Sequence, residues 1–325
     1  MAPPTGGARG RGRLVFPGNL PLMSTSAILN NPTAIRITRV AGLVRRAARS
    51  KYRRFVVEGP QGVREAVNYA AGHVLDVYFT EEAARAHADI ADAAVSAGLY
   101  THLVTPEVMR AMSADAQGVL AVVDTGAVAV PPETGAGGGG TGAASAGMEA
   151  DTVGSEAGLS SDSTLAAALS GARLVAVLTE AQDPGNAGTI IRAADAAGAD
   201  AVVLVKGGVD PTNPKVVRAT AGSLFHLPVL AGVELSDAVR GLRAAGLRLL
   251  AADGHGTVSL FDAEAELAAP SAWLLGNEAH GLAPAALDAA DTVVSIPIYG
   301  RAESLNVASA AAICLYASAR AQHLG

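Results

Sequence analysis

Short apolar runs alternate with segments of helical periodicity in two parts of the chain, at about 55–123 and about 173–321. Runs such as Leu174–Leu178 have the length and aliphatic composition of buried strands. They are followed by apolar residues spaced three to four apart, as on one face of a helix. Strands that alternate with helices are typical of α/β domains. The pattern therefore predicts two α/β domains, the second with a mostly parallel sheet covered on both faces.

The boundaries of the expected elements follow from the same pattern. In the first domain we expect helices over 63–67 and 81–97, and strands over 55–59, 73–79, 99–104 and 120–123. In the second domain we expect strands over 173–179, 201–205, 228–230, 247–252, 273–276 and 292–296. The helices expected there are 188–197, 214–221, 235–245, 283–289 and 306–321. Glycine directly follows two of these helices, as it does at many helix ends.

Two stretches of the chain lack the composition of a folded core. Residues 131–163 are rich in Gly, Ala, Ser and Thr, and they contain no Lys or Arg. Such a sequence cannot bury enough apolar surface to order itself. We therefore predict a disordered basic tail over 1–23, an α/β domain over 24–128, a flexible linker over 129–170 and a second α/β domain over 171–325.

Positive charge is concentrated at the amino-terminal end of the chain. The formal net charge is −6, yet residues 1–64 hold twelve of the 24 Lys and Arg residues and only one of the 30 acids. A basic run is ordinarily a solvated helix face, but a basic end on an acidic chain also suits a phosphate backbone. The candidate RNA contacts in this run are Arg45, Arg46, Arg49, Lys51, Arg53 and Arg54.

Several classes of protein do not fit the composition. Cys314 is the only cysteine, which excludes an internal disulfide and a cysteine-based zinc cluster, and we expect it to be buried. The histidines lack the spacing of metal ligands. No apolar run approaches the roughly 18 residues that span a bilayer, and prolines interrupt the apolar segment near the amino terminus, unlike a secretory signal. We expect a cytoplasmic protein without a membrane segment or a bound metal.

Three loops carry polar residues directly after predicted strands. Asp183–Arg192 begins with a Pro-Gly turn, Leu274–Leu282 places one acid between two glycines, and Ile296–Asn306 leads into an Ala-rich helix. The plainest interpretation is structural: Asn186 and Ser304 are helix N-caps, and Asn306 is a polar residue of the first helical turn. Loops at the ends of parallel strands are also where α/β proteins commonly bind ligands.

Taken together and in this order, the three loops resemble the three motifs of the SpoU-type (TrmH-like) branch of the SPOUT family of RNA methyltransferases. The family patterns are N-x-G-x-x-x-R, then L-G-x-E-x-x-G, then I-P-x-x-G-x-x-x-S-L-N-V. The matching residues are Asn186, Gly188 and Arg192, then Gly276, Glu278 and Gly281, then Ile296, Pro297, Gly300, Ser304, Leu305, Asn306 and Val307. The resemblance covers about 173–322, with the motifs in the family's order and spacing.

The resemblance implies transfer of a methyl group from S-adenosylmethionine to a ribose 2′-hydroxyl of RNA. It also implies a catalytic domain tied in a deep trefoil knot and a homodimer that completes the site. By the same resemblance the catalytic residues are Asn186, Arg192, Glu278, Ser304 and Asn306, and the cofactor is held mainly through the main chain at Gly276, Ile296 and Leu305. Lys215 and Arg218 are candidate RNA contacts, with a solvated helix face as the alternative.

The resemblance gives Arg192 the task of deprotonating or polarising the 2′-hydroxyl. A guanidinium group has a pKa above about 12, so it keeps its proton at neutral pH. Clamping a phosphate or stabilising a developing alkoxide is therefore the easier task for this side chain. Either role makes Arg192 indispensable.

The first domain resembles, less extensively, the ribosomal-protein-like substrate-binding domain of many SpoU-type enzymes. It shares the order of a basic helix, a Phe-Val-Val-Glu-Gly strand and a further helix. Because such relatives often act on large-subunit RNA, ribosomal RNA is favoured over transfer RNA. Two alternatives remain: a transfer-RNA 2′-O-methyltransferase, and a non-catalytic RNA-binding or ribosome-assembly protein of the same fold. A dinucleotide-dependent enzyme fits poorly, because neither domain has G-x-G-x-x-G after its first strand.

Overall fold

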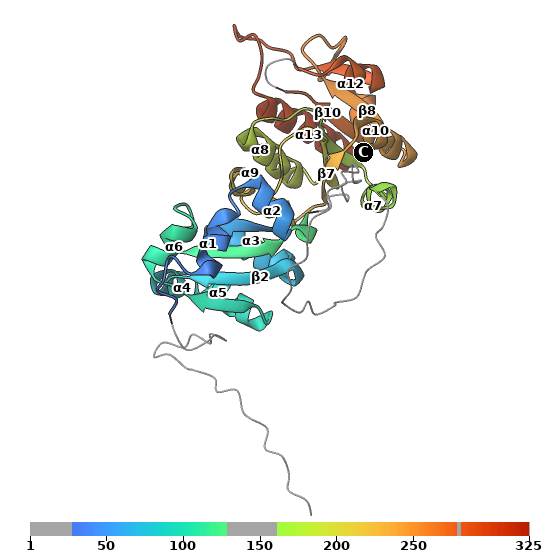
Figure 1. The fold of residues 1–325 in the computed structure, drawn as a ribbon. Coiled ribbons are helices and arrows are strands. Elements are labelled where there is room, and N and C mark those ends of the chain that lie inside the picture. Colours follow the sequence, from blue (N-terminus) through green and yellow to red (C-terminus); the bar gives the residue numbers. More distant parts are fainter. Residues whose placement is uncertain (1–27, 129–160, 278–280, 325) are drawn as a thin grey trace, which may run out of the picture. The chain divides into compact units, whose positions relative to one another are not determined.

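The computed structural model describes residues 28–128, 161–277 and 281–324 (Figure 1). Its internal contacts group the chain into two compact units, which are described separately. Unit one consists of Met1–Ala127 with Thr212–His226, and unit two of Val128–Pro211 with Leu227–Gly325. The predicted basic tail and most of the predicted linker lie outside the described residues.

One segment differs from the predicted division into domains. The prediction assigns Thr212–His226 to the second domain, whereas the structure groups it with unit one. Its helix α9 (Pro214–Ala219) packs against strand β1 (Arg54–Glu58), and Phe225 stacks on Phe55 with 6.5 Å between the ring centroids. Contacts between residues so far apart in sequence leave no trace in local periodicity, so this boundary was not predicted.

Unit one contains a four-stranded mixed sheet with the order β1-β4-β2-β3. β4 (Val119–Asp124) pairs antiparallel with β1 and with β2 (Val74–Phe79), and β2 pairs parallel with β3 (Tyr100–Leu103). β4 is buried along nearly its whole length, as suits a central strand. These strands lie close to the positions that the apolar pattern predicts.

Helices and short 3-10 turns complete unit one. The helices besides α9 are α1 (Ile35–Gly42), α2 (Arg46–Tyr52), α3 (Pro60–Tyr69), α4 (Glu81–Ala86), α5 (Ala88–Ser96) and α6 (Pro106–Met112), and the turns are Ala71–His73, Thr125–Ala127 and Ser223–Phe225. The predicted helix over 81–97 is two helices, because His87 leaves the helical conformation (φ −123°, ψ 50°). The unpredicted α1 and α6 bury Ile37, Val40 and Met109 in one apolar cluster.

Unit two is built on a seven-stranded sheet with the order β7-β6-β5-β10-β8-β11-β9, and every neighbouring pair is parallel. The strands are β5 (Leu174–Leu178), β6 (Ala201–Val205), β7 (Val229–Val233), β8 (Arg248–Ala252), β9 (Val258–Ser259), β10 (Ser271–Leu275) and β11 (Thr292–Ser295). The predicted parallel α/β sheet is confirmed. The apolar pattern missed β9, which is only two residues long.

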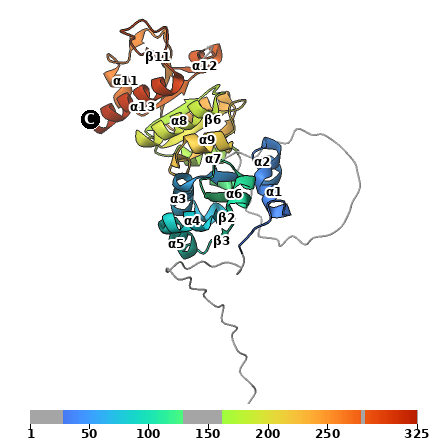
Figure 2. The same cartoon turned by 90° about the vertical axis from the view of Figure 1, so that its left-hand side faces the viewer.

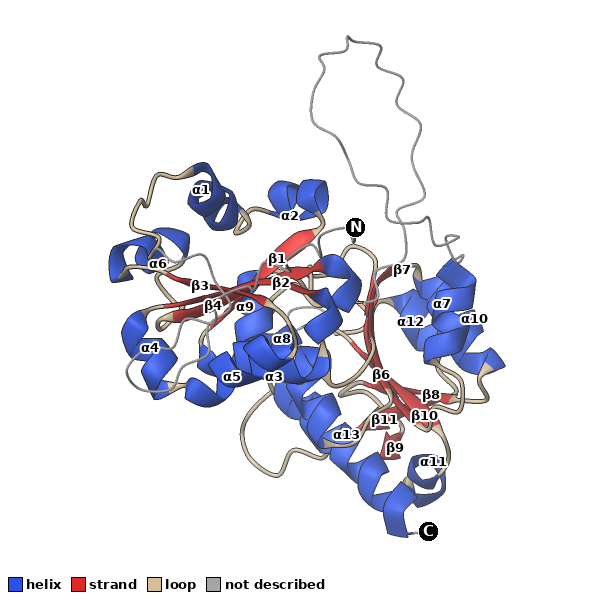
Figure 3. Cartoon of the chain, turned by 90° about the horizontal axis from the view of Figure 1, so that it is seen from below, coloured by secondary structure: helices blue, strands red, loops and turns tan. Residues whose placement is uncertain are grey.

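Helices cover both faces of this sheet (Figure 3). They are α7 (Ser161–Ala168), α8 (Pro184–Ala196), α10 (Leu235–Ala244), α11 (Glu264–Ala268), α12 (Pro284–Ala289) and α13 (Val307–Leu324). Because side chains alternate along a strand, Val175 and Val177 pack on one face with α7, α10 and α12. The prediction of a linker up to residue 170 is wrong, because Leu165 of α7 and Leu169 directly after this helix are buried in the cluster.

The opposite face of the sheet carries α8 and α13, which pack against each other (Figure 2). Trp273 of β10 is fully buried there, and its Nε1 donates a hydrogen bond to Oγ of Ser318 on α13 (2.9 Å). Cys314, on the same helix, is buried as predicted, and burial raises the pKa of its thiol to about 12. This long helix is therefore anchored to the centre of the sheet.

Candidate active site

All three polar loops follow strands at one edge of the sheet of unit two. The strands run parallel, so their carboxyl ends lie side by side. The first loop follows β5, the second follows the neighbouring strand β10, and the third follows β11, which β8 separates from β10. Loops at this edge commonly form the ligand site of parallel α/β sheets. We call this region the carboxyl edge.

In the first loop the helix begins earlier than predicted. Asp183, rather than Asn186, is the N-cap of α8, and its Oδ1 accepts a hydrogen bond from the Asn186 amide nitrogen (2.8 Å). Pro184 occupies the first helical position, where its fixed φ and missing N–H are well tolerated. The predicted capping role of Asn186 is therefore wrong.

A contact of the Asn186 side chain joins the first loop to the third. Nδ2 of Asn306 donates a hydrogen bond to Oδ1 of Asn186 (3.1 Å), across 120 residues of sequence. Oδ1 of Asn306 accepts from the backbone nitrogens of Ala308 (2.9 Å) and Ser309 (3.4 Å), so it caps α13. The N-cap interpretation of Ser304 is therefore wrong, and Ser304 is an exposed loop residue. The side-chain amide of Asn306 therefore both caps α13 and is hydrogen-bonded to the first loop.

The second loop owes its shape to its glycines. The backbone nitrogen of Asn277 donates to the Gly281 carbonyl (3.0 Å), and that of Gly281 donates to the Asn277 carbonyl (3.1 Å). A Cβ at Gly276 would lie 2.2 Å from the Gly281 carbonyl oxygen, and Gly281 has a φ of +68°. Both positions therefore require glycine. Glu278 lies outside the described residues, so its predicted catalytic role stays a prediction.

A side-chain contact that the sequence did not predict joins the first and second loops. Nδ2 of Asn277 donates a hydrogen bond to Oε2 of Glu180 (3.1 Å) in a partly buried position. Glu180 follows β5 by two residues, and Asn277 follows β10 by two residues. The signal in the sequence that could have identified this contact is Glu180, an acid just beyond a buried strand. Side-chain hydrogen bonds thus connect the first loop with the second and the first loop with the third.

Arg192 stands apart from these contacts. It lies about two turns into α8, is exposed, and forms no side-chain hydrogen bond or ion pair within the described part of the chain. The structure therefore brings Asn186 and Asn306 together but does not bring Arg192 or Ser304 into contact with them. A charged group that none of the described residues pairs with is available to an anionic substrate.

The predicted cofactor contacts lie at the same edge. Gly276 directly follows β10, Ile296 directly follows β11, and Leu305 immediately precedes the cap residue of α13. Leu305 is 38% exposed and Ile296 is half-buried, so apolar side chains remain open beside main-chain groups. A cofactor with an aromatic base and a polar sugar fits such a lining, in which the main chain supplies the hydrogen bonds.

The predicted RNA contacts in unit one divide into exposed and structural residues. Arg45, Arg46, Lys51, Arg53, Arg54 and Lys215 are exposed. Arg49 is 3% exposed, and it donates to the carbonyls of Leu43 (3.0 Å) and Val44 (2.7 Å) and to Oγ1 of Thr212 (3.1 Å). Its assignment to RNA is therefore wrong, because its donors already hold the fold of unit one.

Arg218 is also committed within unit one. Its guanidinium pairs with the carboxylates of Glu58 and Asp115, the latter at 2.9 Å. Glu58 is 7% exposed, so this pair is shielded from solvent on one side. The sequence suggested a free cation on a helix face, whereas the structure shows an internal ion pair that attaches α9 to β1.

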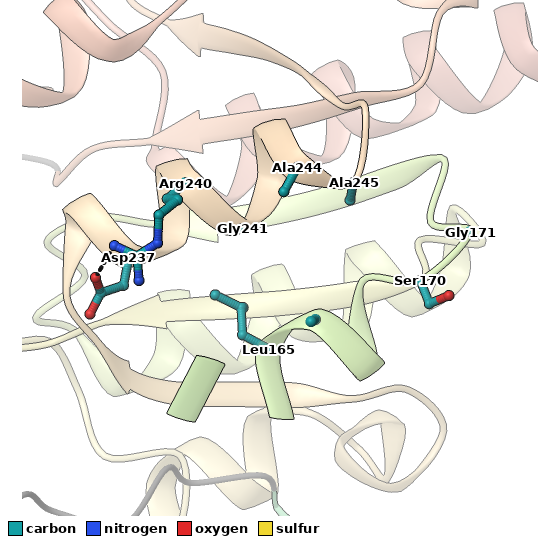
Figure 4. A pocket seen from close by; sticks show the side chains of 9 residues that line it. Leu165, Ser170, Gly171, Asp237, Arg240, Gly241, Ala244 and Ala245 are labelled. Carbon is teal, nitrogen blue, oxygen red and sulfur yellow. Dashed lines mark ion pairs between the residues drawn. The ribbon is translucent and has the colours of Figure 1, made fainter. Parts of the chain in front are cut away.

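Figure 4 shows a hollow of about 590 Å³ in unit two. It is bounded by α7 and α10, and its lining includes Leu165, Gly241 and an ion pair between Asp237 and Arg240 (2.8 Å). None of its lining residues belongs to the three loops. It is a seam between two helices rather than part of the candidate active site.

The described residues contain neither a metal-binding cluster nor a membrane-spanning helix. In the ranges 28–128, 161–277 and 281–324, no three His, Cys, Asp or Glu side chains are placed to hold a metal ion. Over the same ranges, no helix combines the length and apolar character needed to cross a membrane.

Comparison with known protein families identifies the second half of the chain. Residues 173–316 match the model of the SpoU rRNA Methylase family. The chain is 44% identical over 151 residues to the 23S rRNA (guanosine(2553)-2′-O)-methyltransferase RlmP of Bacillus subtilis, covering 46% of this chain and 58% of that protein. It is 42% identical over 142 residues to the 23S rRNA (uridine(2479)-2′-O)-methyltransferase of Streptomyces viridochromogenes, covering 42% and 49% respectively. The chain thus spans about half the length of the curated relatives it matches.

Comparison with solved structures extends the similarity over most of the chain. A crystal structure of an RNA 2′-O ribose methyltransferase matches with a TM-score of 0.66 and 30% identity, covering 92% of this chain and 100% of that one. The SpoU methyltransferase AviRb from Streptomyces viridochromogenes, in complex with the cofactor AdoMet, matches with a TM-score of 0.68 and 27% identity, covering 90% and 100%. Motifs, fold and comparisons agree, and the chain belongs to the SpoU rRNA methylase family.

Proposed function

We propose that this protein transfers a methyl group from S-adenosylmethionine to a ribose 2′-hydroxyl of RNA, with ribosomal RNA preferred to transfer RNA. The observation that carries the proposal is the hydrogen bond between Asn306 and Asn186, which unites two of the family motifs at the carboxyl edge. The names of the relatives, 23S rRNA 2′-O-methyltransferases, and the AdoMet complex of AviRb support the choice of substrate and cofactor.

The chemistry assigns separate tasks to the residues of the carboxyl edge. S-adenosylmethionine, when bound, supplies an electrophilic methyl group. As the 2′-oxygen bonds to the methyl carbon, the methyl–sulfur bond would break with its electron pair left on the sulfur, and the hydroxyl proton would pass to an RNA phosphate oxygen or to water. Negative charge would develop on the 2′-oxygen, which needs a cation nearby. The guanidinium cation of Arg192 stabilises this charge or holds an adjacent phosphate. Asn186, Asn306 and Ser304 orient the ribose, and Glu278 is proposed to fix the second loop.

Main-chain groups of Gly276, Ile296 and Leu305 are proposed to hold the cofactor. Glycine at position 276 keeps the second loop narrow, since a Cβ there would overlap the Gly281 carbonyl. The open apolar side chain of Leu305 offers a surface for the adenine ring. These residues bind and orient, and none of them needs to take part in the proton transfer.

The finer architecture is also part of the proposal. α13 follows β11 in sequence but packs against α8, β5 and β10 on the other side of β8, so the chain returns across the carboxyl edge. We propose that this return forms the deep trefoil knot of the family. For unit one we propose the ribosomal-protein-like substrate-binding fold.

A homodimer is proposed to complete the site. Ile313 and Tyr316 lie three residues apart on α13, at 38% and 53% exposure, and so form an apolar stripe on one side of a long helix. A second copy of the chain is the proposed partner of this stripe. A clean monomer with full activity in solution would contradict this part of the proposal.

RNA is proposed to bind unit one through the exposed cations of its basic run. Those cations are Arg45, Arg46, Lys51, Arg53 and Arg54, together with Lys215 on α9. Phosphate contacts of this kind give affinity without sequence preference. Because the proposed substrate is ribosomal RNA, we place the protein in the cytoplasm.

The decisive test uses purified protein, labelled S-adenosylmethionine and total RNA from a strain that lacks the gene, followed by mapping of 2′-O-methyl sites. One labelled position in large-subunit RNA is the expected result. Label in transfer RNA instead would favour the first alternative. Donor binding without any incorporation, on naked RNA and on ribosomal particles alike, would favour a non-catalytic RNA-binding protein.

A further inference from the structure

The most exposed large hydrophobic side chain in the described residues belongs to the third loop. Tyr299 is 88% exposed, whereas Ile298 and Leu305 of the same loop are 40% and 38% exposed. Within the described part of the chain, the Tyr299 ring forms no ring contact and its hydroxyl no hydrogen bond. An aromatic residue left in water beside a candidate active site indicates a ligand surface.

Tyr299 lies in the third loop between a proline and a glycine. Pro297 has a fixed φ two residues before it. Gly300 follows, and a Cβ on that glycine would meet no atom within 4 Å, so the space next to the ring is open. The same loop continues to Asn306, whose side chain is tied to Asn186. The ring is therefore presented from a loop that is anchored at the carboxyl edge.

Three kinds of ligand could contact the Tyr299 ring: the cofactor, a second subunit or RNA. The residues around the ring distinguish among them. Cofactor contacts are proposed for Ile296 and Leu305, which are far less exposed than Tyr299. A subunit interface favours apolar surroundings, but Arg301 and Glu303 are exposed charges within four residues of the ring. An aromatic face beside an arginine matches the chemistry that binds an unstacked RNA base and its phosphate.

We propose that Tyr299 is a stacking platform for a base of the substrate RNA, at or beside the methylated nucleotide, and that Arg301 contacts a phosphate of the same strand. This inference rests on the proposed function and gives it a specificity-determining residue. Stacking selects a single-stranded or flipped-out nucleotide, because a paired base has no free face. The loop would therefore read the local structure of the RNA before methyl transfer.

The test compares Tyr299→Ala, Tyr299→Phe and Arg301→Ala, with Tyr100→Ala as control. Tyr100 is a 72% exposed tyrosine on β3 of unit one. The probe is a transcript of large-subunit ribosomal RNA, bound without methyl transfer. Tyr299→Ala should weaken binding roughly 5- to 100-fold, the range for one stacked base, while Tyr299→Phe and the control stay within about twofold. Arg301→Ala should lower the salt dependence of binding.

Two further measurements identify any other occupant. Donor affinity by calorimetry and sedimentation of the protein should be unchanged in all four variants. A loss of donor affinity in Tyr299→Ala would assign the ring to the cofactor, and dissociation into monomers would assign it to the second subunit; either overturns the inference. RNA substituted with 5-iodouridine should cross-link under light to the tryptic peptide that holds Tyr299. Its absence from the cross-linked peptides would also count against stacking.

Failure of this inference is distinguishable from failure of the proposed function. Wild-type protein that labels no RNA overturns the proposed function. Wild-type protein that labels RNA, with Tyr299→Ala binding and labelling equally well, overturns only the role of Tyr299.

Discussion

The carboxyl edge of unit two and the basic helix of unit one use arginine in opposite ways. On α2, Arg49 is 3% exposed and donates to two backbone carbonyls and to the Thr212 hydroxyl. On α8, Arg192 is exposed and has no hydrogen-bonding side-chain partner within the described part of the chain. The local density of charge is far higher around Arg49. The contacts of a cation, rather than the charge of its neighbours in sequence, therefore decide whether it supports the fold or is available to a substrate.

The largest effect is expected at Arg192. Replacing it with alanine should lower methyl transfer about 100- to 1,000-fold, because it removes the cation that stabilises the developing oxyanion. Donor affinity by calorimetry should stay near that of the wild type. Arg240→Ala, a change of an exposed arginine on α10, is the matched control and should retain activity. Equal loss of donor affinity and activity would assign Arg192 a structural role and remove the contrast with Arg49.

Arg49 should show the reverse behaviour. Arg49→Ala removes the donor of the buried Leu43 carbonyl and of the partly buried Val44 carbonyl, so the free energy of unfolding should fall by about 2–4 kcal/mol. Arg49→Lys should recover only part of this, since an ammonium group lacks the planar fork. Denaturant unfolding measures the change, with Arg46→Ala as the exposed neighbour that should stay within about 0.5 kcal/mol. A stable Arg49→Ala protein with weakened RNA binding would restore its predicted role as an RNA contact.

The next effect concerns the narrow second loop. Gly276→Ala places a Cβ 2.2 Å from the Gly281 carbonyl oxygen, so the loop must shift. We expect a loss of about 1–3 kcal/mol, divided between the free energy of unfolding and the free energy of donor binding. Gly254→Ala is the control, because a Cβ there meets no atom within 4 Å. Unchanged donor affinity in a stable Gly276→Ala protein would show that the second loop does not hold the cofactor.

Local patterns in the sequence predict the strands of the sheet and the positions of the motif loops. They do not predict features that depend on contacts between residues far apart in the sequence. Buried strands such as β5 and β6 are continuous aliphatic runs, so their positions and their parallel arrangement were predictable. The helix caps were not predictable. Helix α8 begins at Pro184, and Asn306 caps α13 through Oδ1 while its Nδ2 donates a hydrogen bond to Asn186. The burial of Arg49 depends on Thr212, 163 residues away. Such pairs become visible only when the chain is folded.

The pair of asparagines permits a finer test of the carboxyl edge. Asn306→Asp keeps an oxygen that can cap α13 but loses the donor to Asn186, whereas Asn306→Ala loses both. We expect Asn306→Asp to keep the stability of the wild type and lose about tenfold in methyl transfer, and Asn306→Ala to lose about 1 kcal/mol of stability as well. A double-mutant cycle with Asn186→Ala measures the coupling. Additive effects would show that the hydrogen bond does not contribute to the site.

The smallest effect is expected at the exposed part of the basic run. Replacing Arg45 and Arg46 together with alanine should leave the free energy of unfolding unchanged, since both side chains are exposed. The slope of log affinity for RNA against log salt concentration should fall by about 0.7–0.9 for each phosphate that the protein no longer neutralises. Filter binding at several salt concentrations measures it, with Arg240→Ala as control. An unchanged slope would mean that these arginines form a solvated helix face. In that case Arg49 would support the fold, and Arg45 and Arg46 would not contact the substrate. The comparison would then leave Arg192 as the arginine that contacts RNA.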